Sequence, residues 1–386
     1  MTDTYNLIAY DGTGARCVVG ERAIPRYESH DISELVTAAA SAVGAPVAML
    51  GVHDDDLLCV EVLDDSGLTL IDAELPDGWA ERAPWRQPGW YAATVERIDA
   101  ALGEAGFRRT GEAVQTKHWS ISALMRVPTD GGDVWFKQVP AMFAHEGRLV
   151  AWLAELVPEL MAAPLAVGDD WWIAHDLGAE QPVPAGQELG AVDVLVTLQG
   201  AASERADELL LLGCPDRRLP VLLAEVAALA DRGDALSDEQ RDRLRASLPA
   251  LAAVVDRLGV AGLPDTVVHG DFHSGNTRFT RAGWSIYDWT DGCLAHPLTD
   301  LAPSGFAQGE AVAMADGRLA RTTTAWQARC PALTEQVAAL GLVVGAAHQL
   351  VTYYRIADGV EANSVQTWAG EGGRWADQLI LMLAAS

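Results

Sequence analysis

Two carboxylates and an amide that suit phosphoryl transfer lie close together in the stretch VVHGDFHSGNTRFTRAGWSIYDWTD. Asp271 and Asn276 follow the β-branched residues 267–268, and Asp288 follows a second short apolar run. In phosphoryl transfer one Asp accepts the proton of the attacking hydroxyl, while an Asn and a second Asp hold Mg²⁺ against the phosphates. The stretch therefore predicts Asp271 as the catalytic base, and Asn276 with Asp288 as the metal ligands.

The same stretch leaves a second chemistry open, because His269, Asp271 and His273 alternate as H-x-D-x-H. On a strand these three side chains would point to one side and could bind Zn²⁺, which is the arrangement of a metal-dependent hydrolase. The remaining histidines form no H-x-H or H-E-x-x-H pattern, so the other ligands of such a site are unaccounted for. The hydrolase hypothesis also gives no role to Asn276 and Asp288.

The spacing from His269 through Asp271 to Asn276 equals the H-x-D-x-x-x-x-N of a kinase catalytic loop, and Asp288 falls where the Asp of D-F-G would stand. With HGDFHSGN followed by IYDWTDGCLAHPLTDLA, the chain resembles the aminoglycoside phosphotransferase and choline kinase superfamily. The resemblance implies a two-lobed protein-kinase-like fold, Mg²⁺, and ATP or GTP as the phosphoryl donor. It also implies transfer to a hydroxyl of an aminoglycoside-like antibiotic, an amino sugar or a related compound.

Strand-like runs upstream carry the residues expected to hold the nucleotide. Lys137 lies in the run VWFKQV and is one of only two lysines among 27 basic side chains. Because a lysine ammonium is a compact charge suited to phosphates, we expect Lys137 to contact the α- and β-phosphates. Glu146, in the helix predicted over 142–156, is expected to pair with Lys137 and aim it. The plainer alternatives are a surface lysine and a Glu that only favours the helix dipole.

The resemblance adds further nucleotide contacts. The first hairpin reads WSIS in place of G-x-G-x-x-G, and members of this superfamily commonly use a serine-bearing loop there. Ser120 and Ser122 are therefore expected to contact phosphates. Ala174, His175 and Asp176 fall at the hinge between the lobes, where backbone groups would bind the adenine edge.

Composition and turn signals predict an α+β protein in three parts. Residues 1–88 contain short strand-like runs and one helix near 31–43, which indicates a small α+β module without recognisable chemistry. The segment PDGWAERAPWRQP, rich in Pro and Trp, ends this module. We expect residues 89–178 to form a mostly antiparallel N-lobe and 179–386 to form a helical C-lobe with the catalytic loop. Within the C-lobe, Tyr354 and Trp368 are the expected acceptor contacts.

The balance of charges bears on partners. The chain has 54 acidic and 27 basic residues, a formal net charge of -27. Such a surface repels nucleic acids and anionic membranes, so neither is an expected partner. The expected partner is a small hydroxylated acceptor. Five scattered cysteines without C-x-x-C and an N-terminus without a signal-peptide pattern predict a cytoplasmic protein, monomeric or homodimeric.

A third hypothesis keeps the fold but removes the catalysis, leaving a silent binding protein with residues 1–88 as its interaction surface. The lysine, the catalytic-loop pattern and the following Asp occur in the order that a kinase requires. That agreement favours the kinase. Phosphorylation of an acceptor panel would separate it from the binding protein, and zinc content would separate it from the hydrolase.

Overall fold

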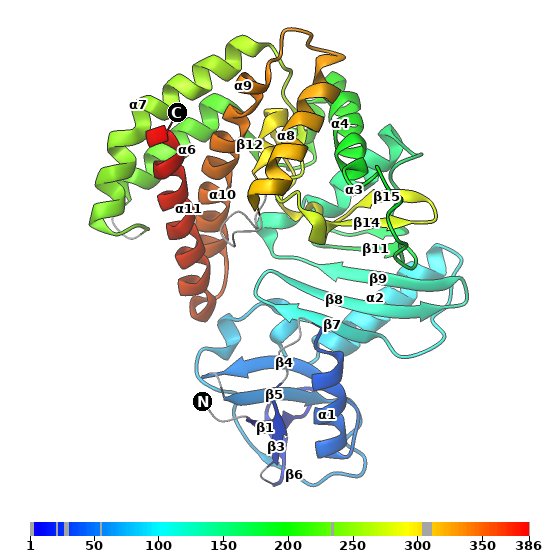
Figure 1. Cartoon of the computed structure of the whole chain (residues 1–386). Helices are drawn as coiled ribbons and strands as arrows, with labels where there is room; N and C mark the ends of the chain where they lie inside the picture. Colours follow the sequence, from blue (N-terminus) through cyan, green and yellow to red (C-terminus); the bar gives the residue numbers. More distant parts are fainter. Residues whose placement is uncertain are drawn as a thin grey trace. The chain divides into compact units, whose positions relative to one another are not determined.

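The computed structural model describes residues 4–20, 22–26, 31–54, 56–232, 235–302 and 311–385, which form two compact units (Figure 1). The first unit comprises Met1–Ala141, Pro164–Asp176 and Val360–Ala362, and the second comprises Met142–Ala163, Leu177–Gly359 and Asn363–Ser386. The first unit is built mainly from strands and the second mainly from helices. The predicted α+β class is therefore confirmed.

The first unit begins with a mixed sheet in the order β4-β5-β1-β2-β6, with β3 also paired to β1. Its strands are β1 (Thr4–Tyr10), β2 (Arg16–Val18), β3 (Arg22–Pro25), β4 (Val47–His53), β5 (Leu57–Val62) and β6 (Leu70–Asp72). Helix α1 (Ser33–Val43) packs its apolar face on this sheet, where Leu35, Ala39 and Val43 join the buried core. The sheet and helix match the α+β module expected from the turn signals.

A second sheet of the same unit is antiparallel throughout and has the order β10-β11-β9-β8-β7. Its strands are β7 (Val114–Trp119), β8 (Ser122–Thr129), β9 (Gly132–Gln138), β10 (Ala166–Val167) and β11 (Trp171–His175). Helix α2 (Trp90–Glu104) places Ile98 and Leu102 against Met125, Phe136 and Ile173. This burial of one helix face on one sheet face holds the strand that carries Lys137.

Buried polar groups join the two sheets. The Gln115 side chain accepts from the backbone N of Met49 at 2.7 Å, and the His118 ring contacts the Leu50 carbonyl at 3.2 Å. Because a buried polar group left without a partner costs about 1–3 kcal/mol, these bonds favour a single way of docking the sheets. The boundary predicted at 88/89 thus lies in a connection inside one compact unit.

The second unit contains α3 (Glu146–Leu156), α4 (Gly190–Ala202), α5 (Glu208–Leu211), α6 (Leu219–Asp231), α7 (Asp238–Ala261), α8 (Ala311–Gln327), α9 (Glu335–Ala338), α10 (Leu340–Gly359) and α11 (Val365–Ala385). Helices α6, α7, α10 and α11 pack together (Figure 1). A small sheet of β12 (Asp216–Arg217), β16 (Cys293–Ala295) and β13 (Thr266–Val268), with the hairpin β14 (Thr277–Thr280) and β15 (Gly283–Ile286), completes the unit. Helix α4 packs on both β13 and β15.

One helical segment of the described chain, Glu335–Gly359, is long and apolar enough to cross a membrane by length and composition. The structure buries 78 % of its apolar window inside the protein, as expected for a core helix.

Four buried histidines link stability to pH. Burial lowers the pKa of His118 and His348 to about 3, and that of His145 and His296 to about 4. These rings stay neutral in the folded protein as the pH falls below the ordinary value of 6.5, whereas they take up protons on unfolding. The unfolded state then binds more protons, so stability falls with pH.

We expect the free energy of unfolding to fall between pH 6.5 and pH 4 by about 1.4 kcal/mol per pH unit for each of these histidines. His118→Gln retains a donor for the Leu50 carbonyl and should remove one histidine's share of this slope. Urea unfolding across that pH range measures it. His53→Gln, at a half-buried position in β4, is the matched control and should keep the full slope. An unchanged slope in His118→Gln would contradict the assignment.

Candidate functional site

The loop that carries Asp271 starts from a strand buried at every position. Strand β13 pairs with β16, with Val267 opposite Leu294 and Val268 opposite Cys293. The β-branched side chains suit a buried strand, because their stiff Cβ packs well on a pleated surface. The strand therefore delivers the residues after Val268 from a fixed point in the core.

The carboxylate of Asp300 holds the backbone of this loop. Its Oδ2 accepts from the backbone N of His269 at 3.0 Å, and its Oδ1 accepts from that of Gly270 at 2.9 Å. Gln199 of α4 donates its Nε2 to the same Oδ2 at 3.0 Å. Burial raises the pKa of Asp300, which is 5 % exposed, while the backbone donors and the charge of Arg318 act to lower it.

Gly270 has a conformation and a setting that no other residue fits. Its φ is +82°, in the left-handed region that L side chains rarely adopt. A Cβ there would lie 2.5 Å from the Asp291 carbonyl oxygen and 3.0 Å from Nε2 of His348. Gln349 Nε2 donates to the Gly270 carbonyl at 2.5 Å. The turn into Asp271 is thus set by contacts on several sides.

His269 braces the loop through both ring nitrogens. Its Nε2 lies 3.0 Å from the Tyr287 carbonyl, which can only accept, so Nε2 carries the proton. Its Nδ1 accepts from the backbone N of Asp271 at 3.3 Å. Because both nitrogens are engaged and the ring is fully buried, His269 cannot serve as a zinc ligand. No group of three or more His, Cys, Asp or Glu suited to a metal occurs in the described part of the chain, and the hydrolase hypothesis is not supported.

Asp271 and Asn276 are held together. Asn276 Nδ2 donates to the Asp271 backbone carbonyl at 2.9 Å and to its Oδ2 at 3.1 Å. His273 Nε2 lies 3.4 Å from the same Oδ2, and the Asp271 side chain is 27 % exposed. The amide nitrogen of Asn276 is thus committed to Asp271, which leaves its Oδ1 as the atom suited to a hard cation.

The hairpin β14–β15 brings Asp288 beside Asn276. Thr277 pairs with Ile286, and the backbone N of Tyr287 donates to the Asn276 carbonyl at 3.0 Å. Asp288 follows directly, with φ +63° and ψ +61°, a left-handed conformation that is costly for a non-glycine residue. Thr290 donates its hydroxyl to Asp288 Oδ1. An amide and a carboxylate oxygen at adjacent strand ends fit Mg²⁺, which prefers oxygen ligands.

Glu146 lies on the same unit as this pair. It is fully buried as the first residue of α3, and the Thr290 hydroxyl lies 3.4 Å from its Oε1. Lys137, on β9, belongs to the first unit, with Leu124 and Trp172 as its neighbours across the sheet. The pairing of Lys137 with Glu146 stays a prediction.

The remaining nucleotide residues also lie on the first unit. The Trp119 indole donates to the Ser122 hydroxyl at 2.6 Å, and Ser120 occupies the turn between β7 and β8. At the predicted hinge, Ala174 and His175 end β11 and the Asp176 carboxylate accepts from the Trp135 indole at 2.6 Å. Their contacts with a nucleotide remain predictions.

On the acceptor side, the structure gives the predicted Tyr354 a packing role. Tyr354 is 2 % exposed, its hydroxyl donates to the Ala235 carbonyl, and its ring packs against Gly372 of α11. The neighbouring Tyr353 lies on a different face of α10, because consecutive helical residues differ by about 100° in direction. Burial raises the pKa of Tyr353, and the charges of Asp271 and Asp291 raise it further. Those charges place Tyr353, which the sequence reasoning passed over, near the catalytic loop.

Tyr353 and the predicted Trp368 form one aromatic pair. Their ring centroids are 6.0 Å apart with an interplanar angle of 30°. The pair joins α10 to α11 and presents half-buried aromatic surface. Helical residues one apart differ by about 100° in direction, so a shift of one position changes which face a tyrosine occupies. The acceptor contact predicted for Trp368 stays a prediction, and Tyr353 lies beside Trp368.

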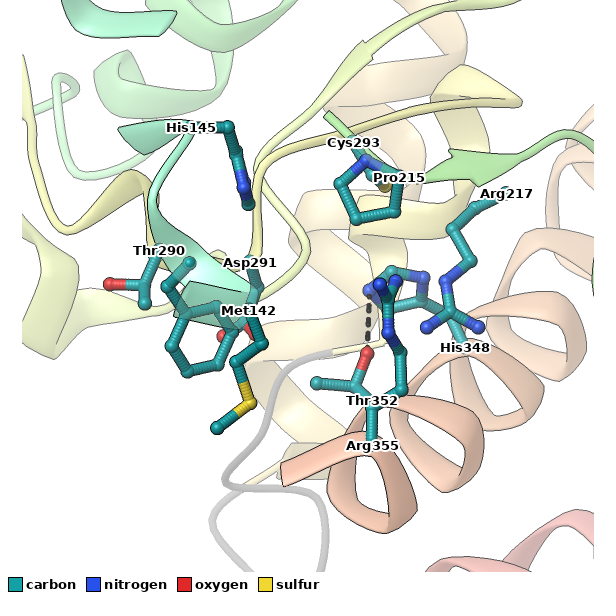
Figure 2. Close-up of a pocket in the computed structure, with 11 residues that line it drawn as sticks. Met142, His145, Pro215, Arg217, Thr290, Asp291, Cys293, His348, Thr352 and Arg355 are labelled. Atoms are coloured by element: carbon teal, nitrogen blue, oxygen red, sulfur yellow. Dashed lines mark hydrogen bonds between the residues drawn. The ribbon is translucent and has the colours of Figure 1, made fainter. Parts of the chain in front are cut away.

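A cavity in the second unit is lined in part by residues of α10, among them His348, Thr352 and Arg355 (Figure 2). In it the Thr352 hydroxyl and His348 Nε2 are 3.3 Å apart. The charge of Arg355 adds to burial in lowering the pKa of both His145 and His348, while Asp271 acts to raise that of His348. The cavity is thus within the electrostatic field of the catalytic loop. Its lining residues are Met142, Phe143, His145, Pro215, Arg217, Thr290, Asp291, Cys293, His348, Thr352 and Arg355.

A β-rich unit and a helical unit with H-x-D-x-x-x-x-N and a following Asp define the class of protein-kinase-like phosphotransferases. Residues 211–340 match the family model of the phosphotransferase enzyme family (APH). This match confirms the resemblance drawn from HGDFHSGN and IYDWTDGC and the enzyme class, a phosphotransferase acting on hydroxyl groups. The acceptor is not fixed by it.

Solved structures share the fold. A macrolide 2′-phosphotransferase type I is 18 % identical, with 72 % of this chain and 96 % of that chain covered and a TM-score of 0.51. A choline/ethanolamine kinase family protein from Mesorhizobium loti is 16 % identical, with 75 % and 95 % covered and a TM-score of 0.52. No curated protein matches the chain. These similarities confirm the predicted kinase-like fold.

Asp300→Asn should weaken the catalytic loop. The substitution places an NH₂ donor where a carboxylate oxygen accepts backbone N–H groups, so we expect a loss of about 1–3 kcal/mol in the free energy of unfolding and lower turnover. Urea unfolding and a phosphotransfer assay measure the two effects. The control is Asp193→Asn, in an exposed pair with Arg321, which should stay within about 0.5 kcal/mol of wild type. Equal losses in both variants would show that the loop anchor has no special role.

Proposed function

We propose that the protein transfers the γ-phosphoryl group of ATP or GTP to a hydroxyl of an aminoglycoside-like antibiotic, an amino sugar or a related hydroxylated compound. The observation that carries the proposal is the hydrogen-bonded arrangement of Asp271 with Asn276, beside which the hairpin register brings Asp288. These are the three groups that a kinase needs for its base and its metal ligands.

In this proposal Asp271 accepts the proton of the acceptor hydroxyl. Asn276 and His273 both approach its Oδ2, so the carboxylate is oriented before the acceptor arrives. A pre-oriented group avoids reorganisation during the reaction, which is the main way an enzyme assists phosphoryl transfer. The backbone behind it is held by Asp300 through His269 and Gly270.

Asn276 Oδ1 and the Asp288 carboxylate would hold Mg²⁺, which when bound neutralises charge on the phosphates. Thr290 donates to one Asp288 oxygen and so orients the carboxylate. We assign Lys137 to the α- and β-phosphates, with Glu146 as its partner. Ser120 and Ser122 are assigned to phosphate contacts, and the backbone at 174–176 is assigned to the adenine edge.

The acceptor side combines aromatic surface with negative charge. Tyr353 and Trp368 supply the aromatic surface, and Asp271 and Asp291 act electrostatically on Tyr353. Carboxylates beside aromatic rings suit an acceptor that bears both hydroxyl and amino groups. With a formal net charge of -27, we further propose a cytoplasmic enzyme, monomeric or homodimeric, that does not act on nucleic acids or membranes.

A panel of amino sugars, aminoglycosides, amino alcohols and plain sugars, tested with ATP and with GTP for release of the nucleoside diphosphate, tests this function. Asp271→Ala should lower kcat on the active acceptor by about 10²–10⁴, because the proton acceptor is removed. Asp256→Ala, at an exposed position of α7, is the control and should keep wild-type turnover. Near-wild-type turnover in Asp271→Ala would overturn the assignment of the base.

Tyr353→Ala should raise the KM for the acceptor about tenfold while the KM for the nucleotide stays unchanged, since the aromatic wall is lost on the acceptor side alone. Its neighbour provides the contrast. Tyr354→Phe removes one buried hydrogen bond and should lower stability by about 1 kcal/mol without changing either KM. Steady-state kinetics with each substrate varied in turn decide the matter. A rise in acceptor KM confined to Tyr354→Phe would reverse our assignment.

A further inference from the structure

The small module of residues 1–88 carries no recognisable chemistry, yet it contacts a segment between α10 and α11. The chain leaves the second unit at the end of α10, contributes Val360–Ala362 to the first unit, and returns to the second unit before α11. This three-residue corner is far in sequence from everything else in the first unit. Its contacts therefore show what the module does for the corner itself.

Glu361 is the residue of the corner that engages the module. Its Oε1 lies 2.9 Å from Nη1 of Arg86, and its Oε2 accepts from the backbone N of Ala83 at 3.2 Å. The Arg86 and Glu361 side chains are 11 % and 3 % exposed. Breaking such a buried pair by removing one partner costs about 3–5 kcal/mol, because it leaves the other charge buried and unpaired.

The turn that contacts Glu361 also contacts the β7–β8 hairpin, which is expected to face the phosphates. The 3-10 turn η2 (Pro84–Arg86) contains Trp85, which is fully buried and donates its Nε1 to the Trp119 carbonyl at 2.8 Å. Trp119 ends β7, directly before Ser120. Burial lowers the pKa of His118, and the charge of Arg86 lowers it further, which places Arg86 beside the same strand.

The corner lies between the two aromatic residues of the acceptor side. Tyr353 precedes Glu361 on α10 and Trp368 follows it on α11, each about two helical turns away. The corner connects the end of α10 to the short 3-10 turn η9 (Ala362–Ser364) that precedes α11, so its position bears on where both helices end. A residue that holds the corner acts on the acceptor through those rings.

We propose that residues 83–86 and Glu361 form a clasp through which the N-terminal module couples the β7–β8 hairpin to the corner between α10 and α11. In this view Arg86 and Glu361 are positioning residues for the acceptor, a role that rests on the proposed function. The coupling itself rests only on the contacts within the first unit. The module is then a brace that holds this corner and the hairpin together within the first unit.

The chain supplies a matched control for the clasp. Asp358 lies one turn before Glu361 and pairs with Arg232 at 2.6 Å, with the two side chains 53 % and 33 % exposed. Exposed pairs contribute only about 0–1 kcal/mol. Asp358→Asn therefore removes a carboxylate and an ion pair from the same helix end without touching the clasp.

Hydrogen–deuterium exchange of the full chain tests the coupling without any knowledge of the acceptor. In Glu361→Gln, we expect exchange to quicken about tenfold or more in peptides of the corner (355–368) and also of the hairpin (114–124), while strands β13 and β16 keep their protection. Asp358→Asn should leave both regions as in wild type. The double variant Arg86→Glu with Glu361→Arg, which restores opposite charges, should recover part of the protection in both.

Faster exchange at the corner with unchanged exchange in the hairpin would overturn the proposal, because the pair of Arg86 and Glu361 would then stabilise only the corner. Equal quickening throughout the protein would overturn it as well, because the pair would only stabilise the fold. If Glu361→Gln does not fold, Glu361→Asp, which shortens the reach to Arg86 and Ala83, replaces it with the same expected pattern.

Kinetics add the functional arm once an acceptor is found. Glu361→Gln should raise the acceptor KM several-fold with little change in the KM for the nucleotide, and Asp358→Asn should change neither. An unchanged acceptor KM alongside the expected exchange pattern would remove the acceptor role and keep the coupling. If no acceptor is phosphorylated by wild type, the proposed function fails, and the exchange result still decides the clasp.

Discussion

The loop that carries Asp271 depends on one buried carboxylate. Asp300 accepts two consecutive backbone N–H groups, those of His269 and Gly270, and these donors offset part of the cost of burying its charge. The backbone can make this turn only because Gly270 takes a left-handed φ and leaves room for the Asp291 carbonyl. The position of Asp271 is therefore set by buried groups that hold the backbone before it, chiefly Asp300 and Gln349.

The candidate site residues that the structure brings together are those whose distances local structure determines. Asn276 stands next to Asp271 because a short turn separates them, and Asp288 reaches Asn276 because a tight hairpin returns the chain to the same point. Each distance is set within a few residues, so spacing alone carries the information. The strand and helix patterns of the first sheet were readable for the same reason, since alternation and turn signals are local.

The parts that were missed depend on contacts between distant segments. The sequence does not indicate whether Tyr353 or Tyr354 faces the loop. Helix α10 is buried on nearly all sides, so its apolar residues do not mark one face. Nothing near Glu361 marks it as the partner of Arg86, and nothing near Gln115 marks it as the partner of Met49. Such pairs are specified by packing and desolvation in three dimensions, and a single sequence contains no spacing rule for them.

The charged groups of the chain act at two different ranges. The net charge of -27 is spread over the surface, where salt screens it beyond about 8 Å, so it steers encounters more than it selects bound molecules. The groups near the loop act at short range, where Asp271 and Asp291 raise the pKa of Tyr353, and Arg355 lowers the pKa of His145 and His348.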